Sequence, residues 1–172
     1  TGLVLRDTML LEFASSIMSL LLAGKVGSNI ASEIGSMRIT EQIDALEIMG
    51  VNSANYLILP KVIGLVLCMP LLVTFSVFCG LIGGTGVAYF TDLIPVADFI
   101  YGIQYAFIPY YFTYSIIKSL FFGFIIASIS AFYGYYAYGG ALNVGRASTN
   151  AVVNSSIVIL LMNIVLTQLL LV

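Results

Sequence analysis

The chain has 172 residues, of which 60% are hydrophobic and only 8% are charged. Soluble domains carry roughly a quarter charged residues, so this composition excludes a soluble globular protein and predicts an integral membrane protein. The net charge of −2 and the lack of a basic run argue against nucleic-acid binding. There is no histidine, and Cys68 and Cys79 would lie too far apart on one helix for a disulfide bond. The sequence therefore predicts no metal site and no cofactor.

Four segments are long and apolar enough to cross a bilayer, which takes about 20 residues. In chain order, the expected spans are about 8–32, 57–88, 112–138 and 149–172. The first is the weakest, because Glu12 and Lys25 bound its uncharged stretch, and Lys25 is expected to snorkel to one membrane face. The pattern predicts an all-α integral membrane protein, a polytopic helical bundle that forms one domain over residues 1–172.

One face of the first span carries polar side chains at helical spacing, and they are Glu12, Ser15, Ser16 and Ser19. A carboxylate is costly in lipid and usually faces a cavity or the interior of a bundle. The alternative is that Glu12 lies at the interface, solvated by headgroups. The serines extend the polar stripe inward, which favours a substrate path. Lys118 is a possible partner for Glu12, but snorkelling of this lysine is the favoured interpretation.

Small residues recur at every fourth position further along the same span, in two ladders: Gly24, Ser28 and Ser32, and Gly27, Ala31 and Gly35. Such small-xxx-small ladders let a second helix approach closely. We therefore expect this part of the first span to pack against other helices.

Between the first and second spans, the chain is unusually rich in charge, with Glu33, Arg38, Glu41, Asp44 and Glu47 in one short window. A helical wheel places Ile39, Ile43, Leu46 and Met49 on one side and the acidic residues, with Ile48 among them, on the other. Thr40 is the expected N-cap, and Gly50 is the expected residue that ends the helix. Helices on anionic lipid are basic, so an acidic one favours docking to a protein over a solvated connector.

The distribution of Lys and Arg predicts the orientation. The connections around 33–61 and 139–150 carry the basic residues Arg38, Lys61 and Arg146, whereas 89–109 has only Asp92 and Asp98. We expect the charged segment at residues 33–50, the acidic insert, to be cytoplasmic. Residues 89–111 are expected to form an outward-facing loop and interfacial segment.

Residues 22–64, LAGKVGSNIASEIGSMRITEQIDALEIMGVNSANYLILPKVIG, closely resemble the signature region of the MlaE permease family. The motifs AGK-x-G, E-[IL]-G-x-M-R-x-T-E-Q and ALE-x-MG-V appear in order. The resemblance continues more loosely to GRAST at 145–149. Members of this family are membrane subunits of ABC transporters that move phospholipids and related lipids across the bacterial envelope, so the resemblance implies a multi-pass protein of the bacterial inner membrane.

The resemblance also implies partners. Residues 36–50 would be a coupling helix that docks on a separate cytoplasmic ATPase, with Arg38, Glu41, Asp44, Glu47 and Ile48 as candidate coupling residues. The ATPase would bind ATP, so the permease itself would not be an enzyme. Two copies would pair as a homodimer, with the lipid path between them opening toward an MCE-domain lipid-binding protein. Full-length members have five spans, and this chain is expected to be a piece that lacks the first.

One departure concerns the polar end of the first span. Many family members have R-E-h-G-P (h, hydrophobic) where this chain has Leu11, Glu12, Phe13, Ala14 and Ser15. The absent arginine argues against phosphate recognition by charge at this site, and the absent Gly-Pro predicts a straighter helix. Two other functions remain as alternatives, an ion-coupled secondary transporter and a non-transporting membrane scaffold.

Overall fold

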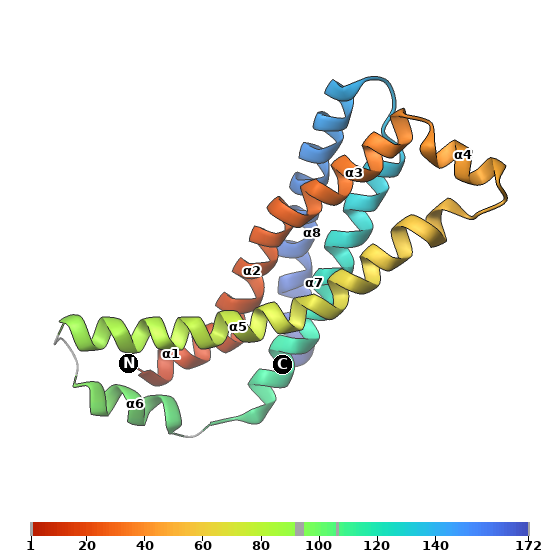
Figure 1. Ribbon diagram of the computed structural model, residues 1–172. Helices are drawn as coiled ribbons and strands as arrows, with labels where there is room; N and C mark the ends of the chain where they lie inside the picture. Colours follow the sequence, from red (N-terminus) through yellow and green to blue (C-terminus); the bar gives the residue numbers. More distant parts are fainter. Residues whose placement is uncertain (1, 92–94, 106, 172) are drawn as a thin grey trace.

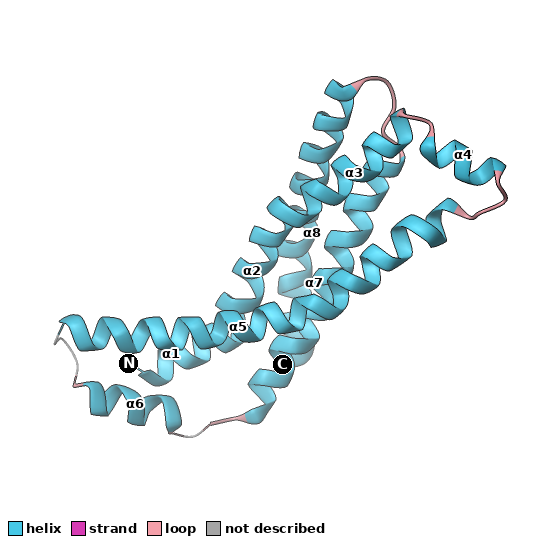
Figure 2. Cartoon of the chain, in the orientation of Figure 1, coloured by secondary structure: helices cyan, strands magenta, loops and turns pink. Residues whose placement is uncertain are grey.

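The computed structural model describes residues 2–91, 95–105 and 107–171. Within these ranges the chain is helical, with no strand, and four helical stretches are long and apolar enough to cross a membrane (Figures 1 and 2). These stretches are Gly2–Ile39, Ala54–Thr91, Pro109–Tyr135 and Ala141–Leu171. The predicted all-α, polytopic fold is confirmed.

The four long stretches and the connections between them are built from the following helical elements. In chain order they are α1 (Gly2–Thr8), a π-helical turn (Met9–Phe13), α2 (Ala14–Leu22), a second π-helical turn (Ala23–Gly27), α3 (Ser28–Ile39), α4 (Gln42–Ile48), a third π-helical turn (Ala54–Ile58), α5 (Leu59–Thr91), α6 (Val96–Gln104), α7 (Pro109–Tyr135) and α8 (Ala141–Leu171).

The first long stretch is not the straight helix that the missing Gly-Pro predicts. Its hydrogen bonding widens to a π-helical turn at Met9–Phe13, which contains Glu12, and again at Ala23–Gly27. In Figure 1, α1 and α2 run in different directions on the two sides of the first turn. Single π-helical turns inside α-helices are frequent at functional sites.

The acidic insert is shorter than the expected 36–50. Residues 36–39 form the last turn of α3, and Thr40 ends that helix by donating its hydroxyl to the Ser36 carbonyl at 2.8 Å. Thr40 is therefore a C-cap of α3 rather than an N-cap of α4. Glu41 then adopts a left-handed backbone (φ 59°), which breaks the helix before α4 begins at Gln42. Gly50, with φ 80°, lies in the turn after α4, as expected.

The other boundaries move by a few residues. The third span ends at Tyr135 rather than at 138, and the fourth begins at Ala141, eight residues before the expected 149. Arg146 and the rest of GRAST therefore lie on α8, in the region that the sequence assigned to a loop. Asn143, whose side-chain amide donates to the Tyr138 carbonyl at 3.0 Å, links the first turn of α8 to the preceding connection.

Helix α7 lies at the centre of the bundle, packed by α3, α5 and α8. Close approach of α3 and α7 depends on small residues. Ala31 is fully buried, and a Cβ built on Gly134 of α7 would lie 2.7 Å from the Ala31 carbonyl oxygen. Gly27 faces α7 and Gly35 faces α8 in the same way, whereas Gly24 has no neighbour within 4 Å of a built Cβ. The ladder of Gly27, Ala31 and Gly35 thus packs against other helices of the same chain, whereas Gly24 of the other ladder is exposed.

Gly134→Ala is expected to lower the stability of the bundle by about 1–3 kcal/mol, because the added methyl group forces two helix backbones apart. Gly64→Ala on α5 is the matched control, since a Cβ there meets nothing within 4 Å. This control is expected to be neutral or to stabilise by up to about 1 kcal/mol through helix propensity. Thermal unfolding of the two detergent-solubilised variants measures the difference, and equal midpoints would contradict the packing argument.

At the opposite end of the bundle from α4, helix α6 lies beside α1 (Figure 1). Arg6 is buried and donates to the carbonyl oxygens of Ile103 and Tyr105, each at 2.8 Å. Its guanidinium also pairs with Asp7 at 2.8 Å. These bonds fix the end of α6 on the bundle, within the segment expected to lie at the outer interface. Asp92, expected in the outward-facing loop, lies outside the described residues.

Candidate functional site

A polar cluster lies inside the bundle, where the first π-helical turn and α2 meet α7 and α8. Glu12 is at its centre. The carboxylate oxygen Oε1 accepts hydrogen bonds from Lys118 Nζ at 2.8 Å and Thr167 Oγ1 at 2.9 Å. The other oxygen, Oε2, accepts from Asn163 Nδ2 at 2.9 Å and Ser16 Oγ at 3.2 Å. Side chains from α2, α7 and α8 therefore converge on one carboxylate.

Lys118 does not snorkel, so the favoured sequence interpretation was wrong. Its side chain is fully buried, whereas that of Glu12 is 38% exposed. Lys118 Nζ donates to Glu12, to Tyr114 OH at 2.8 Å and to Thr167 Oγ1 at 3.1 Å. The ammonium group is stable at this depth because it has a counter-charge and hydrogen-bond acceptors, which are what a buried cation requires.

The serine stripe divides between two environments. Ser16 contributes to the cluster through its bonds to Glu12 and to Asn163 Oδ1, at 3.2 and 3.1 Å. Ser15 and Ser19 are fully buried, and their hydroxyls donate to carbonyl oxygens of their own helix, those of Glu12 and Ser16. Of the four candidate path residues, Glu12 and Ser16 thus retain partial exposure, whereas Ser15 and Ser19 face other helices.

Three members of the cluster were missed in the sequence: Tyr114, Asn163 and Thr167. A signal for them exists, because Tyr114 and Lys118 are four residues apart, as are Asn163 and Thr167, so each pair lies on one helical face. Polar residues at this spacing in two otherwise apolar spans mark faces that turn toward a common polar partner. Their shared target, Glu12, cannot be identified without the packing of the three helices.

A second group of polar contacts holds α4 at the other end of the bundle. Arg38 Nη1 at the end of α3 pairs with Asp44 Oδ1 at 2.7 Å. Glu47 Oε1 accepts hydrogen bonds from Ser53 Oγ and Tyr135 OH, both at 2.9 Å. These two bonds hold the pKa of Glu47 below its ordinary value. Their contribution to stability is present above the pKa of unfolded Glu47 and is lost as pH falls through its lower folded-state pKa.

The remaining candidate coupling residues point outward. Ile48 is 87% exposed and Met49 is 68% exposed, and Glu41 is also exposed. Met49 thus leaves the apolar side that the helical wheel gave it, because α4 ends at Ile48. Ile43 is the anchor, with no exposed surface. Asp44 and Glu47 make contacts within the chain but keep exposed surface, so the residues without such contacts that are available to a partner are Glu41, Ile48 and Met49.

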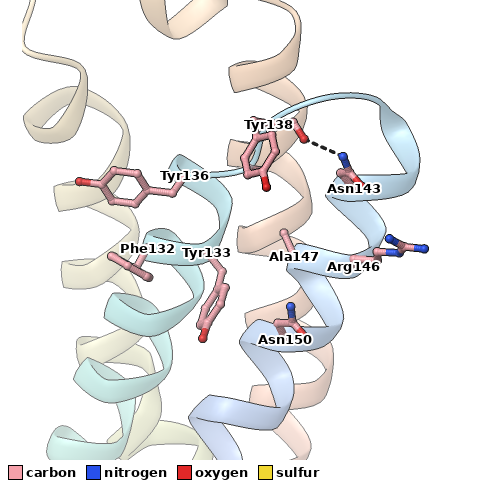
Figure 3. A pocket seen from close by; sticks show the side chains of 9 residues that line it. Phe132, Tyr133, Tyr136, Tyr138, Asn143, Arg146, Ala147 and Asn150 are labelled. Carbon is pink, nitrogen blue, oxygen red and sulfur yellow. Dashed lines mark hydrogen bonds between the residues drawn. The ribbon is translucent and has the colours of Figure 1, made fainter.

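A surface pocket of about 370 Å³ lies where α7 ends and α8 begins (Figure 3). Aromatic side chains from the end of α7 and from the connection after it line one side of the pocket. The other side is lined by Asn143, Arg146 and Asn150 of α8. In Figure 3, the Arg146 guanidinium points away from the aromatic rings. Because the polar groups do not converge on one point, the intramembrane cluster remains the better candidate for a functional site.

The fold and the cluster define a multi-pass helical membrane protein whose bundle contains a hydrogen-bonded ion pair. A family model, "Permease MlaE", matches residues 1–169. The chain therefore belongs to the MlaE permease family, and the resemblance found in residues 22–64 is confirmed.

Comparison with individual proteins gives the same family. The chain is 41% identical to a "Probable ABC transporter permease protein" of Rickettsia bellii, over 92% of this chain and 61% of the relative. It is 37% identical to "Probable ABC transporter permease protein slr1045" of Synechocystis, over 98% of this chain and 64% of the relative. It is 34% identical to "Protein TRIGALACTOSYLDIACYLGLYCEROL 1, chloroplastic" of Arabidopsis thaliana, over 91% of this chain and 45% of the relative. The chain spans less than two thirds of the length of these relatives.

Proposed function

We propose that this chain forms the membrane subunit of an ABC transporter that moves phospholipid or a related lipid between the bacterial inner membrane and the outer parts of the envelope. Membership of the permease family supports the transporter class. The name of the Arabidopsis relative includes that of a glycolipid, trigalactosyldiacylglycerol, which supports a lipid as the substrate. In this proposal ATP is bound and hydrolysed by a separate ATPase, and the permease itself needs no cofactor.

The observation that carries the proposal is the position of Glu12, a carboxylate within the membrane span whose side chain is 38% exposed. A carboxylate facing lipid tails is costly, so its exposed side belongs against a polar path or a second copy of the chain. The fully buried Lys118 neutralises Glu12, and Ser16, Asn163 and Thr167 surround the pair with hydroxyl and amide groups. Such a site favours a headgroup with hydrogen-bonding groups or an amine over recognition of a bare phosphate by charge.

The proposed partners follow from the two ends of the bundle. The exposed side of α4 would dock on the cytoplasmic ATPase, a second permease would face the Glu12 side, and an MCE-domain lipid-binding protein would lie beyond α6. This orientation puts Arg38, Lys61 and Arg146 on the cytoplasmic side, in accord with the positive-inside rule.

An ion-coupled secondary transporter is the weaker alternative. Such proteins use a relay of ionisable groups across the membrane. Among the described residues of α5, α7 and α8, the charged side chains are Lys61, Lys118 and Arg146. Lys61 lies in the first turn of α5 and Arg146 in the second turn of α8. Only Lys118 lies deep in a span, and it is bound to Glu12, so a relay has no further members in these helices.

The test is purification of the full-length permease with its natural partners, followed by reconstitution into liposomes. An ATPase is expected to co-purify, and the complex is expected to transfer fluorescent phospholipid to acceptor vesicles in an ATP-dependent way. Transfer driven by a proton or sodium gradient without ATP would support the secondary transporter. Co-purification of the ATPase without lipid transfer or retained lipid would support the scaffold. Lipid mass spectrometry of the purified complex identifies the headgroup.

A further inference from the structure

Helix α4 has only seven residues, from Gln42 to Ile48, and its N-cap, Glu41, makes no side-chain capping bond. Helices this short are marginal on their own, so its position depends on contacts with the rest of the chain. Ile43 supplies the apolar contact, since it is fully buried in the core cluster. The polar contacts are those of Asp44 and Glu47, and the second of these reaches the central helix of the bundle.

Tyr135, the last residue of α7, connects α4 to its surroundings. Its hydroxyl donates to Glu47 Oε1 at 2.9 Å and lies 3.1 Å from Ser53 Oγ. Ser53 directly precedes the helical stretch that contains α5. Its ring lies under the Arg38 guanidinium, whose Cζ is 5.5 Å from the ring centroid. One side chain therefore contacts the end of α3, the end of α4 and the residue that precedes the helical stretch containing α5.

Helix α7 also carries Lys118 and Tyr114 of the intramembrane cluster. At 1.5 Å per residue, Tyr135 and Lys118 are about 25 Å apart along one continuous helix. α7 is the most enclosed span, with small residues against α3 and α5, so a displacement at its end shifts the helix as a unit. The acidic insert and the Glu12 site are thus connected through a single rigid element.

We propose that Tyr135 is a positioning residue that transmits movement of α4 to the lipid site, through its hydroxyl bond to Glu47 and along α7. This inference rests on the proposed function, and it names the side chain through which the docked ATPase acts on Glu12 and Lys118. The Arg38–Asp44 ion pair, next to the Tyr135 ring, gives α4 a second polar contact, while Ile48 and Met49 remain exposed for the partner.

The test compares Tyr135→Phe with Tyr136→Phe in the full-length permease. Tyr135→Phe keeps the ring beneath Arg38 and removes only the hydroxyl. Tyr136 is the neighbouring residue, is 65% exposed, and serves as the matched control. Loss of a hydrogen bond to a carboxylate is expected to reduce hydrogen-exchange protection of α4 by about ten-fold in Tyr135→Phe. The control is expected to leave protection unchanged.

In the reconstituted complex, Tyr135→Phe is expected to bind its ATPase and hydrolyse ATP as the wild type does, while moving several-fold less lipid per ATP. Glu47→Gln is expected to retain part of the coupling, because the amide oxygen still accepts from Tyr135. Wild-type lipid transfer per ATP, or unchanged exchange of α4, would overturn the proposal. Loss of ATPase binding would overturn it too, since Tyr135 would then only shape the docking surface. A wild-type complex without transfer would instead refute the proposed function, and the exchange experiment on the permease alone would still decide whether Tyr135 holds α4.

Discussion

Glu12→Leu is expected to lower the stability of the bundle by about 3–5 kcal/mol, because it leaves the Lys118 ammonium buried without its counter-charge. It also removes the acceptor of the hydrogen bonds that Lys118, Thr167, Asn163, Ser16 and Tyr114 donate. Glu12→Gln is expected to be milder, since the amide oxygen can still accept from Lys118 or Thr167. Unfolding of the purified variants in detergent measures both effects.

The double variant Glu12→Leu/Lys118→Met separates structure from transport. Replacing a buried ion pair by apolar side chains is often neutral or stabilising, so the second substitution is expected to restore much of the lost stability. Lipid transfer is expected to remain low, because the path would have lost its charged and hydrogen-bonding face. Wild-type transfer by the double variant would show that the pair only holds the helices together, and the lipid path would have to lie elsewhere.

The helical spans and the special character of Glu12 could be predicted from the sequence, because both depend on local patterns. An uncharged run of bilayer length specifies a spanning helix, and a carboxylate inside one specifies a polar neighbour. The partner could not be predicted in the same way. Lys118 is 106 residues from Glu12 along the chain, and snorkelling or pairing of a lysine is decided by how α7 packs against α2 and α8.

The acidic insert shows the same limit at its ends. The apolar and acidic sides of a helical wheel locate α4, but the wheel assumes one continuous helix from Ile39 to Gly50. The left-handed backbone of Glu41 interrupts that helix and rotates the two parts relative to each other. Asp44 and Glu47, which the wheel presents as a free acidic face, therefore meet Arg38 and Tyr135 of the same chain, and only the tertiary structure shows that they are occupied.

Ile48→Asp is expected to abolish most binding of the proposed ATPase while changing the stability of the permease little. Ile48 is 87% exposed on α4, next to the exposed Met49, and contributes no core contact whose loss would unfold the bundle. The few side chains that dominate an interface each cost about 2 kcal/mol or more when truncated. With Ile48 as one of them, the affinity is expected to fall by about thirty-fold. Co-purification and titration of the ATPase against the reconstituted permease measure the loss.

Asp44→Lys provides the contrast for Ile48→Asp. It breaks the pair with Arg38, which is partly exposed and contributes at most about 1 kcal/mol, so a modest loosening of α4 is expected with a smaller loss of affinity. If Asp44→Lys removed the ATPase while Ile48→Asp retained it, the docking side of α4 would be its acidic face, and the apolar tip formed by Ile48 and Met49 would instead lie against lipid headgroups.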